Sequence, residues 1–139
     1  MHTTAKPVLV LCGLLAACTT STAPAVTTWE ATLAAVSPRD LLEGTVAVLS
    51  QHDRLNAGIQ INNAPAAQNL TWQLRSGSCD QPGDIVGGRA VYPSLSPDSL
   101  GSASAQAIVD RTLSADGQYQ ASVLNANSTV IACGELQRR

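Results

Sequence analysis

Alternation between apolar and polar residues is the feature that most constrains the fold of this chain. Between Leu55 and Asn62, every second residue is apolar, and polar residues or Gly stand between them. Because successive side chains of a β-strand point to opposite faces, this period of two predicts a half-buried strand with one apolar face. The stretches 70–75 and 118–123 alternate in the same way. The chain is therefore expected to form β-structure.

Shorter runs predict further strands. The β-branched runs at 45–49 and 129–133 are typical of strands that are buried on both faces. Weaker patterns predict strands at 29–36, 103–113 and 89–92, and a short helical turn at 37–40. About seven or eight short strands separated by turns indicate an all-β sandwich or barrel with antiparallel pairing.

Polar segments between these runs predict the turns. Gln51-His52-Asp53 has hairpin length, Asp116-Gly117 is a favoured tight-turn pair, and residues 125–128 form another short connection. Residues 77–102 are rich in Gly and Pro, and we expect them to form one or two long surface loops.

Size and charge limit the class of protein. The 139 residues are enough for one domain, and 45% of them are hydrophobic. A formal charge of −2 with scattered arginines gives no basic stripe, which argues against a nucleic-acid partner. No apolar run approaches the ~20 residues of a membrane-spanning helix.

The N-terminus has the layout of a secretory signal. Lys6, the only Lys, precedes the apolar run 8–17, which ends in small residues before Cys18. Leu15-Ala16-Ala17-Cys18 resembles the bacterial lipobox. That resemblance implies cleavage before Cys18, diacylglycerol on its sulfur and acylation of its new amine.

This resemblance divides the chain into three parts: a signal peptide at 1–17, a lipidated Cys18 with a flexible spacer at 18–28, and a folded domain at 29–139. Several acyl chains on one residue anchor a protein stably, so we expect a lipid-anchored protein of the bacterial envelope. Thr19 stands where Asp would suggest retention in the inner membrane, so the outer membrane is favoured.

The remaining cysteines predict a crosslink. Cys12 would be removed with the signal, and Cys79 and Cys133 would meet an oxidising compartment after export. A disulfide between them is therefore expected. A redox pair or a pair of metal thiolates is the alternative, but the chain has no Cys-x-x-Cys and offers no further ligands beside them.

Two segments carry a family resemblance. The segment 72–79, Trp-Gln-Leu-Arg-Ser-Gly-Ser-Cys, and the segment 131–136, Ile-Ala-Cys-Gly-Glu-Leu, are similar to the copper-zinc superoxide dismutase-like superfamily, and 44–47 resembles its second strand. The resemblance implies an eight-stranded Greek-key barrel in which a loop cysteine, here Cys79, pairs with Cys133 of the last strand.

The chain departs from that family at the metal site. The family uses six histidines and one aspartate as ligands, whereas His52 is the only histidine that would remain after cleavage. The family's His-x-His would fall near residues 70–74, which hold no histidine, and its active-site arginine corresponds to Val130. The resemblance therefore implies a relative of the fold without copper, zinc or another cofactor.

Other candidate chemistry is weak. His52 lies at an expected hairpin tip, where a lone histidine is usually solvated. Asp80 and Asp84 could offer oxygens to Ca²⁺, but two carboxylates in a turn are more often turn residues. The chain has no Gly-x-Ser-x-Gly, and after removal of the expected signal peptide it has no second histidine for a nucleophilic relay. We expect no catalytic residue and no metal site.

The sequence thus favours a non-catalytic envelope lipoprotein that binds or scaffolds. Its partners would be the membrane, through the N-terminal lipid, and an unknown envelope protein or ligand. The 77–102 region is the expected contact surface, with candidate residues Asp80, Asp84, Arg89 and Tyr92. The alternatives are a metal-handling or superoxide-related enzyme with an atypical site, and a secreted hydrolase inhibitor.

Overall fold

The fold is all-β. The computed structural model describes residues 18–20 and 25–139, so the expected signal peptide at 1–17 and part of the spacer lie outside the described residues. The strands are β1 Val26–Ala35, β2 Glu43–Gln51, β3 Arg54–Asn62, β4 Thr71–Gly77, β5 Pro82–Ile85, β6 Ala103–Val109, β7 Tyr119–Leu124, β8 Val130–Glu135 and β9 Gln137–Arg138, and a 3₁₀ helix, η1, spans Arg89–Val91.

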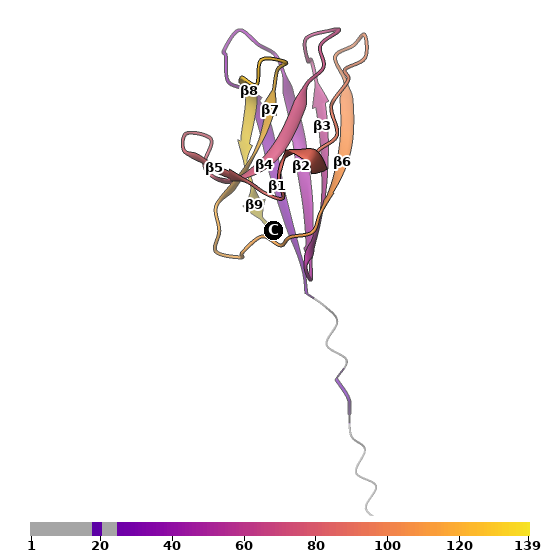
Figure 1. Ribbon diagram of the computed structural model, residues 1–139, viewed down its shortest axis with the longest axis vertical. Coiled ribbons are helices and arrows are strands. Elements are labelled where there is room, and N and C mark those ends of the chain that lie inside the picture. Colours follow the sequence, from indigo (N-terminus) through magenta and orange to yellow (C-terminus); the bar gives the residue numbers. More distant parts are fainter. Residues whose placement is uncertain (1–17, 21–24) are drawn as a thin grey trace, which may run out of the picture.

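The strands form one antiparallel sheet that curls into a half-barrel. Its order is β5-β4-β7-β8-β1-β2-β3-β6, and the short β9 pairs with β1. Figure 1 shows β4, β5, β7 and β8 on one side of the molecule and β2, β3 and β6 on the other. Because the sheet curls, the inward faces of both sides enclose a single hydrophobic core.

The clearest predicted strand is confirmed. In β3, Leu55, Ala57, Ile59 and Ile61 are buried, while most residues between them are exposed. The hairpin before it is also confirmed: Gln51 pairs with Arg54, so the connection is two residues long. The strands predicted near 70–75 and 118–123 are present as β4 and β7.

Both tryptophans belong to the core, as the inward positions in their strands predict. Trp29 packs edge-to-face on Tyr119, with ring centroids 5.6 Å apart. Trp72 packs edge-to-face on Tyr92, at 5.1 Å. The indole N–H groups of both tryptophans are buried and have no hydrogen-bond partner within the described residues. The core therefore gains packing here and leaves two polar groups unsatisfied.

Four strand predictions need correction. The strand expected at 29–36 begins at Val26, because β1 pairs with β2 as far as Gln51, so three residues of the expected spacer belong to the sheet. β2 is buried on one face only, since no further layer covers the outer face of β1, β2 and β3. β8 is likewise not buried on both faces, because it contains half-buried as well as buried residues. β6 ends at Val109, whereas the predicted strand reached Leu113.

Two further predictions were wrong. Residues 89–92 contain η1 instead of a strand, and the short strand of this region is β5. Residues 37–40 form a turn without a helix, closed by the Asp40 N–H donating to the Ser37 carbonyl at 3.1 Å. The predicted tight turn at Asp116-Gly117 is confirmed, and it lies between β6 and β7, which do not pair with each other.

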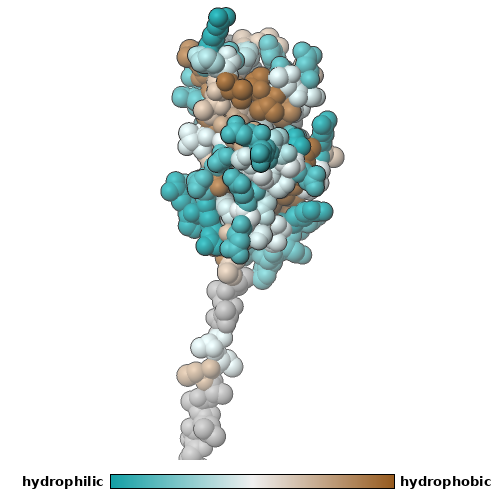
Figure 2. Space-filling view, turned by 90° about the vertical axis from the view of Figure 1, so that its left-hand side faces the viewer, coloured by the Kyte–Doolittle hydropathy of each residue, from teal (hydrophilic) through white to brown (hydrophobic). Residues whose placement is uncertain are grey.

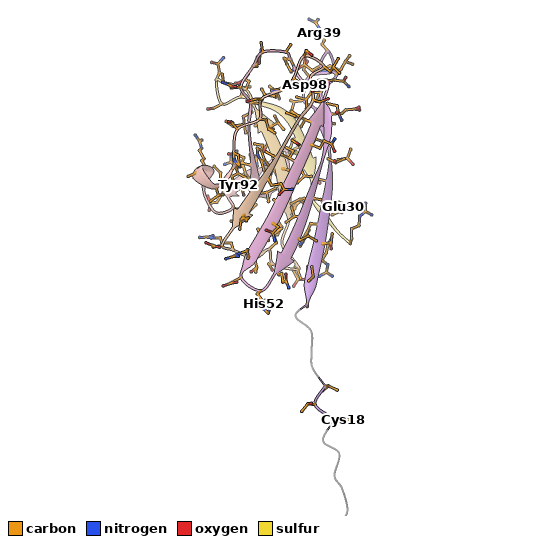
Figure 3. The ribbon with its side chains drawn as sticks, turned by 90° about the vertical axis from the view of Figure 1, so that its right-hand side faces the viewer. Cys18, Glu30, Arg39, His52, Tyr92 and Asp98 are labelled. Atoms are coloured by element: carbon orange, nitrogen blue, oxygen red, sulfur yellow. A yellow bond between two sulfur atoms is a disulfide. The ribbon has the colours of Figure 1, made fainter. Side chains whose placement is uncertain are left out.

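The two ends of the half-barrel differ. Figure 3 shows His52 at one end and Arg39 and Asp98 at the other. Val26 pairs with Gln51, so the chain enters the half-barrel at the His52 end. Figure 2 shows hydrophobic side chains gathered near the opposite end, where Val36 and Leu41 of the β1–β2 connection are exposed. No helix in the described ranges is long and apolar enough to cross a membrane.

Candidate binding site

The predicted contact loop separates into an exposed part and a core part. Asp80, Asp84 and Arg89 are exposed, as expected of contact residues. Tyr92 is only 8% exposed, its hydroxyl donates to the Val86 carbonyl at 2.6 Å, and its ring packs on Trp72. Burial raises the pKa of the Tyr92 hydroxyl to about 12. Tyr92 is therefore packed in the core and presents little surface to a partner.

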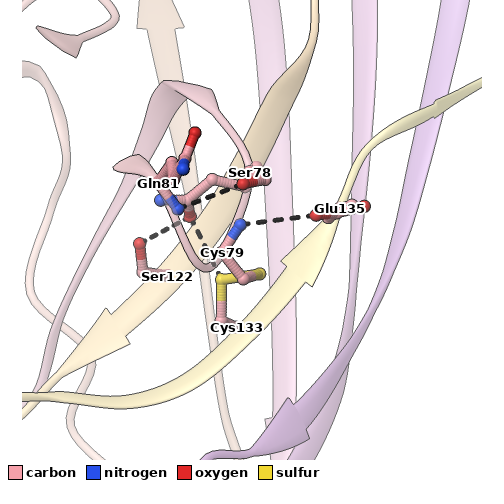
Figure 4. Close-up of a disulfide and its surroundings, with 7 residues drawn as sticks. Ser78, Cys79, Gln81, Ser122, Cys133 and Glu135 are labelled. Atoms are coloured by element: carbon pink, nitrogen blue, oxygen red, sulfur yellow. Dashed lines mark hydrogen bonds between the residues drawn. A yellow bond between two sulfur atoms is a disulfide. The ribbon is translucent and has the colours of Figure 1, made fainter. Parts of the chain in front are cut away.

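The exposed part is fastened to the sheet. The predicted Cys79–Cys133 disulfide is present and joins this segment to β8 across 54 positions of sequence. Arg75 of β4 donates from Nε to the Gly83 carbonyl at 2.7 Å, and the Cys79 N–H donates to Glu135 Oε1 at 3.4 Å (Figure 4). We call residues 77–85 the fastened segment.

Polar side chains are buried next to the fastened segment. Of the four buried polar residues in the described part of the chain, three lie on β4 and β7: Gln73, Gln120 and Ser122. Gln73 is opposite Ser122, and Ser122 is opposite Cys133, so these side chains share the outer face of the sheet. Outer-face residues are normally solvated, so the burial of these three requires a covering element.

We call Gln73, Gln120 and Ser122 the polar cluster, and the hydrogen bonds of this cluster are incomplete. Ser122 donates from Oγ to Gln120 Oε1 at 2.8 Å. Cys133 Sγ lies 3.3 Å from the same oxygen, but a disulfide sulfur carries no proton and cannot donate. Gln73 is 4% exposed, and its Nε2 has no partner within the described residues. An amide donor is therefore buried without an acceptor, which costs free energy unless another molecule supplies one.

A cavity of about 390 Å³ adjoins the polar cluster. Its polar lining comes from Arg75, Asp80, Gln120 and Ser122, and apolar walls come from the end of β1 and the start of β8. A larger hollow of about 660 Å³ lies on the outer face of β1, β2 and β3. That hollow has no buried polar side chain in its lining, so the smaller cavity is the better candidate site.

The other predicted residues lie elsewhere. His52 is exposed in the β2–β3 hairpin and adopts a positive φ of 53°. Across residues 18–20 and 25–139, no three His, Cys, Asp or Glu side chains lie close enough together to hold a metal ion. Cys18, the predicted lipid attachment site, is exposed and forms no disulfide with a described residue.

Sequence reasoning missed the polar cluster. Gln73, Gln120 and Ser122 fall on the polar side of alternating strands, and that pattern alone indicates a solvated face. The available signal was Cys79, because a crosslink from the segment after β4 to β8 draws that segment over the β7 strand between them.

Neither the protein-family models nor the curated proteins contain a match to this chain.

Proposed function

We propose that this protein is a non-catalytic binding module, anchored to the bacterial outer membrane through a lipid on Cys18. The observation that carries the proposal is the polar cluster, in which three buried polar side chains and a cavity lie beside the fastened segment. A small apolar domain gains no stability from burying an unpartnered amide there. Selection for a ligand accounts for its presence.

The fold part of the proposal is a superoxide dismutase-like Greek key. Its support is the strand order, in which β6 adjoins β3 and β7 adjoins β4, so that the β3–β4, β5–β6 and β6–β7 connections cross between the sides of the half-barrel. A second support is the Cys79–Cys133 disulfide, which links the same elements as in that family.

The positions that correspond to the family's catalytic groups favour binding over catalysis. Trp72 and Leu74 of β4, where the His-x-His would fall, pack into the core, and the residue between them is the neutral Gln73. Val130, at the position of the family's arginine, lines the cavity as an apolar wall. The site therefore offers hydrogen bonds and shape, and its lining holds no histidine of the kind that the family uses to bind copper and zinc.

Site-specific photo-crosslinking in the intact envelope tests the binding function. A photoreactive residue is placed at exposed Asp80 or Asp84 and, as the control, at Gln106, which is exposed on β6 away from the cavity. We expect a discrete adduct when the photoreactive residue is at position 80 or 84, and no adduct when it is at position 106. Intact mass shows whether the adduct is a small molecule or a protein. The same adducts at all three positions, or no adduct at any of them, would contradict the proposal.

A further inference from the structure

We infer that the cavity beside the fastened segment binds a carboxylate group that is carried on a short apolar body. This inference rests on the proposed binding function and gives it a ligand class. It follows from the balance of hydrogen-bond donors and acceptors in the cavity, from the apolar walls and from the position of one carboxylate at the rim.

The first argument is that Arg75 presents a fixed guanidinium group to the cavity. Its Nε donates to the Gly83 carbonyl, so the guanidinium is held in place. No hydrogen bond or ion pair joins its terminal nitrogens to another described residue, although Arg75 lines the cavity. A fixed guanidinium with free N–H groups matches the planar, two-oxygen geometry of a carboxylate.

The second argument is an excess of donors beside Arg75. Gln120 uses its Oε1 to accept the Ser122 hydroxyl, which leaves its amide N–H groups for the cavity. The neighbouring Gln73 amide is buried without an acceptor. Arg75 and Gln120 thus present unengaged N–H donors to the cavity, whereas the carboxylate of its lining, Asp80, is exposed at the rim. An anion with two acceptor oxygens would satisfy those donors.

The third argument is the shape and charge of the rest of the cavity. Val36, Val130 and Pro82 give it apolar walls, and its volume of about 390 Å³ suits a small molecule or a chain end. Asp80 lies at the exposed rim and would repel a second negative group. The cavity therefore suits a monocarboxylate more than a dicarboxylate.

Two sources could supply this chemistry: a free small monocarboxylate, or the C-terminal carboxylate of a peptide that ends in an apolar residue. Calorimetric titration of the disulfide-intact full chain, in an uncharged detergent, separates them. Isovalerate and its uncharged amide probe the free acid. A tripeptide Ala-Ala-Val, as free acid and as C-terminal amide, probes the chain end. We expect saturable binding of at least one acid and no binding of its amide.

Two variants test the residues. Arg75→Gln should weaken acid binding by about tenfold or more, because a charge-assisted, two-pronged contact is lost. Arg111→Gln is the matched control, since Arg111 is exposed in the β6–β7 connection and does not line the cavity, and it should leave binding unchanged. Asp80→Asn removes an exposed rim charge without threatening the fold, and it should raise the affinity for glutarate more than the affinity for isovalerate.

The outcomes are distinct. Binding of isovalerate supports a free acid as the source, and binding of the tripeptide acid alone supports a chain end. Equal binding of acids and amides, no binding of either acid, or an Asp80→Asn variant with unaltered selectivity would overturn the inference. If the acids fail while a residue at position 80 still crosslinks in the envelope, the ligand class is wrong and the binding function stands. If both fail, the binding function falls too.

Discussion

Tyr92 links the connection that follows β5 to the core through its hydroxyl and its ring. Its hydroxyl donates to the Val86 carbonyl at 2.6 Å in a buried setting. Replacing Tyr92 by Phe keeps the ring on Trp72 and leaves the carbonyl without its donor. We expect Tyr92→Phe to lower the free energy of unfolding by about 1 kcal/mol at neutral pH, measured by denaturant titration.

The same residue predicts a pH dependence. Burial raises the pKa of Tyr92 from 10.0 to about 12, so the folded state retains a proton that the unfolded chain loses near pH 10. Its contribution to stability is full below pH 10 and is lost as the pH rises from 10 to 12. Thermal unfolding of the native chain should show this loss, and Tyr92→Phe should show less of it. Identical pH profiles would refute the assignment.

Two glycines form a matched pair at the residue scale. A Cβ at Gly134 of β8 would collide with the Thr32 carbonyl of β1, whereas a Cβ at Gly58 of β3 would meet nothing within 4 Å. We expect Gly134→Ala to destabilise the fold by about 1–3 kcal/mol, because backbone has to move. Gly58→Ala should leave the stability unchanged or raise it slightly. Equal denaturation midpoints for the two variants would contradict this prediction, because they would show that β1 and β8 can move apart at Gly134 without loss of stability.

At the scale of elements, the disulfide fastens the segment that covers β7. It closes 54 positions of sequence, which is worth about 4 kcal/mol in the chain-entropy description. The double variant Cys79→Ser with Cys133→Ser should lose roughly 2–5 kcal/mol of unfolding free energy by denaturant titration. A reducing agent should destabilise the native chain and leave the double variant unaffected. A double variant as stable as the native chain would argue against this role.

Alternation predicted the strands best where one face meets the core and the other meets water. β3 follows this pattern, so its position could be found from sequence. β5 could not, because its four residues include Pro and Gly and it exists only through pairing with β4 and the nearby crosslink. Residues 89–92 looked like a strand, but Tyr92 turns inward onto Trp72 and the chain forms η1 there.

The candidate site was only partly predictable for a related reason. Cys79 and Cys133 could be paired from their redox context, and the exposure of Asp80 and Asp84 follows from a polar turn. The burial of Gln120 and Ser122 depends on long-range covering of the outer face, which no local pattern records. The candidate site therefore becomes visible only when the segment and the sheet are placed together.

At the scale of the whole molecule, the proposed anchor and the half-barrel define an orientation. β1 starts at the end that carries His52, so a lipid on Cys18 would leave the opposite end, with Arg39 and Asp98, facing away from the membrane (Figure 3). Cys18→Ala should move the protein from the membrane fraction to the soluble fraction and remove the acyl mass. Cys12→Ala, the control within the expected signal, should change neither. A Cys18→Ala protein that stays membrane-bound would refute the anchor.

The central claim is that the polar cluster forms a binding site and not a redox centre. The most direct test is the metal content of the purified, disulfide-intact chain after incubation with copper and zinc, together with superoxide removal by the same sample. We predict substoichiometric metal and no activity above that of the buffer. Stoichiometric metal or measurable superoxide removal would contradict the account and would make the enzyme alternative the better description.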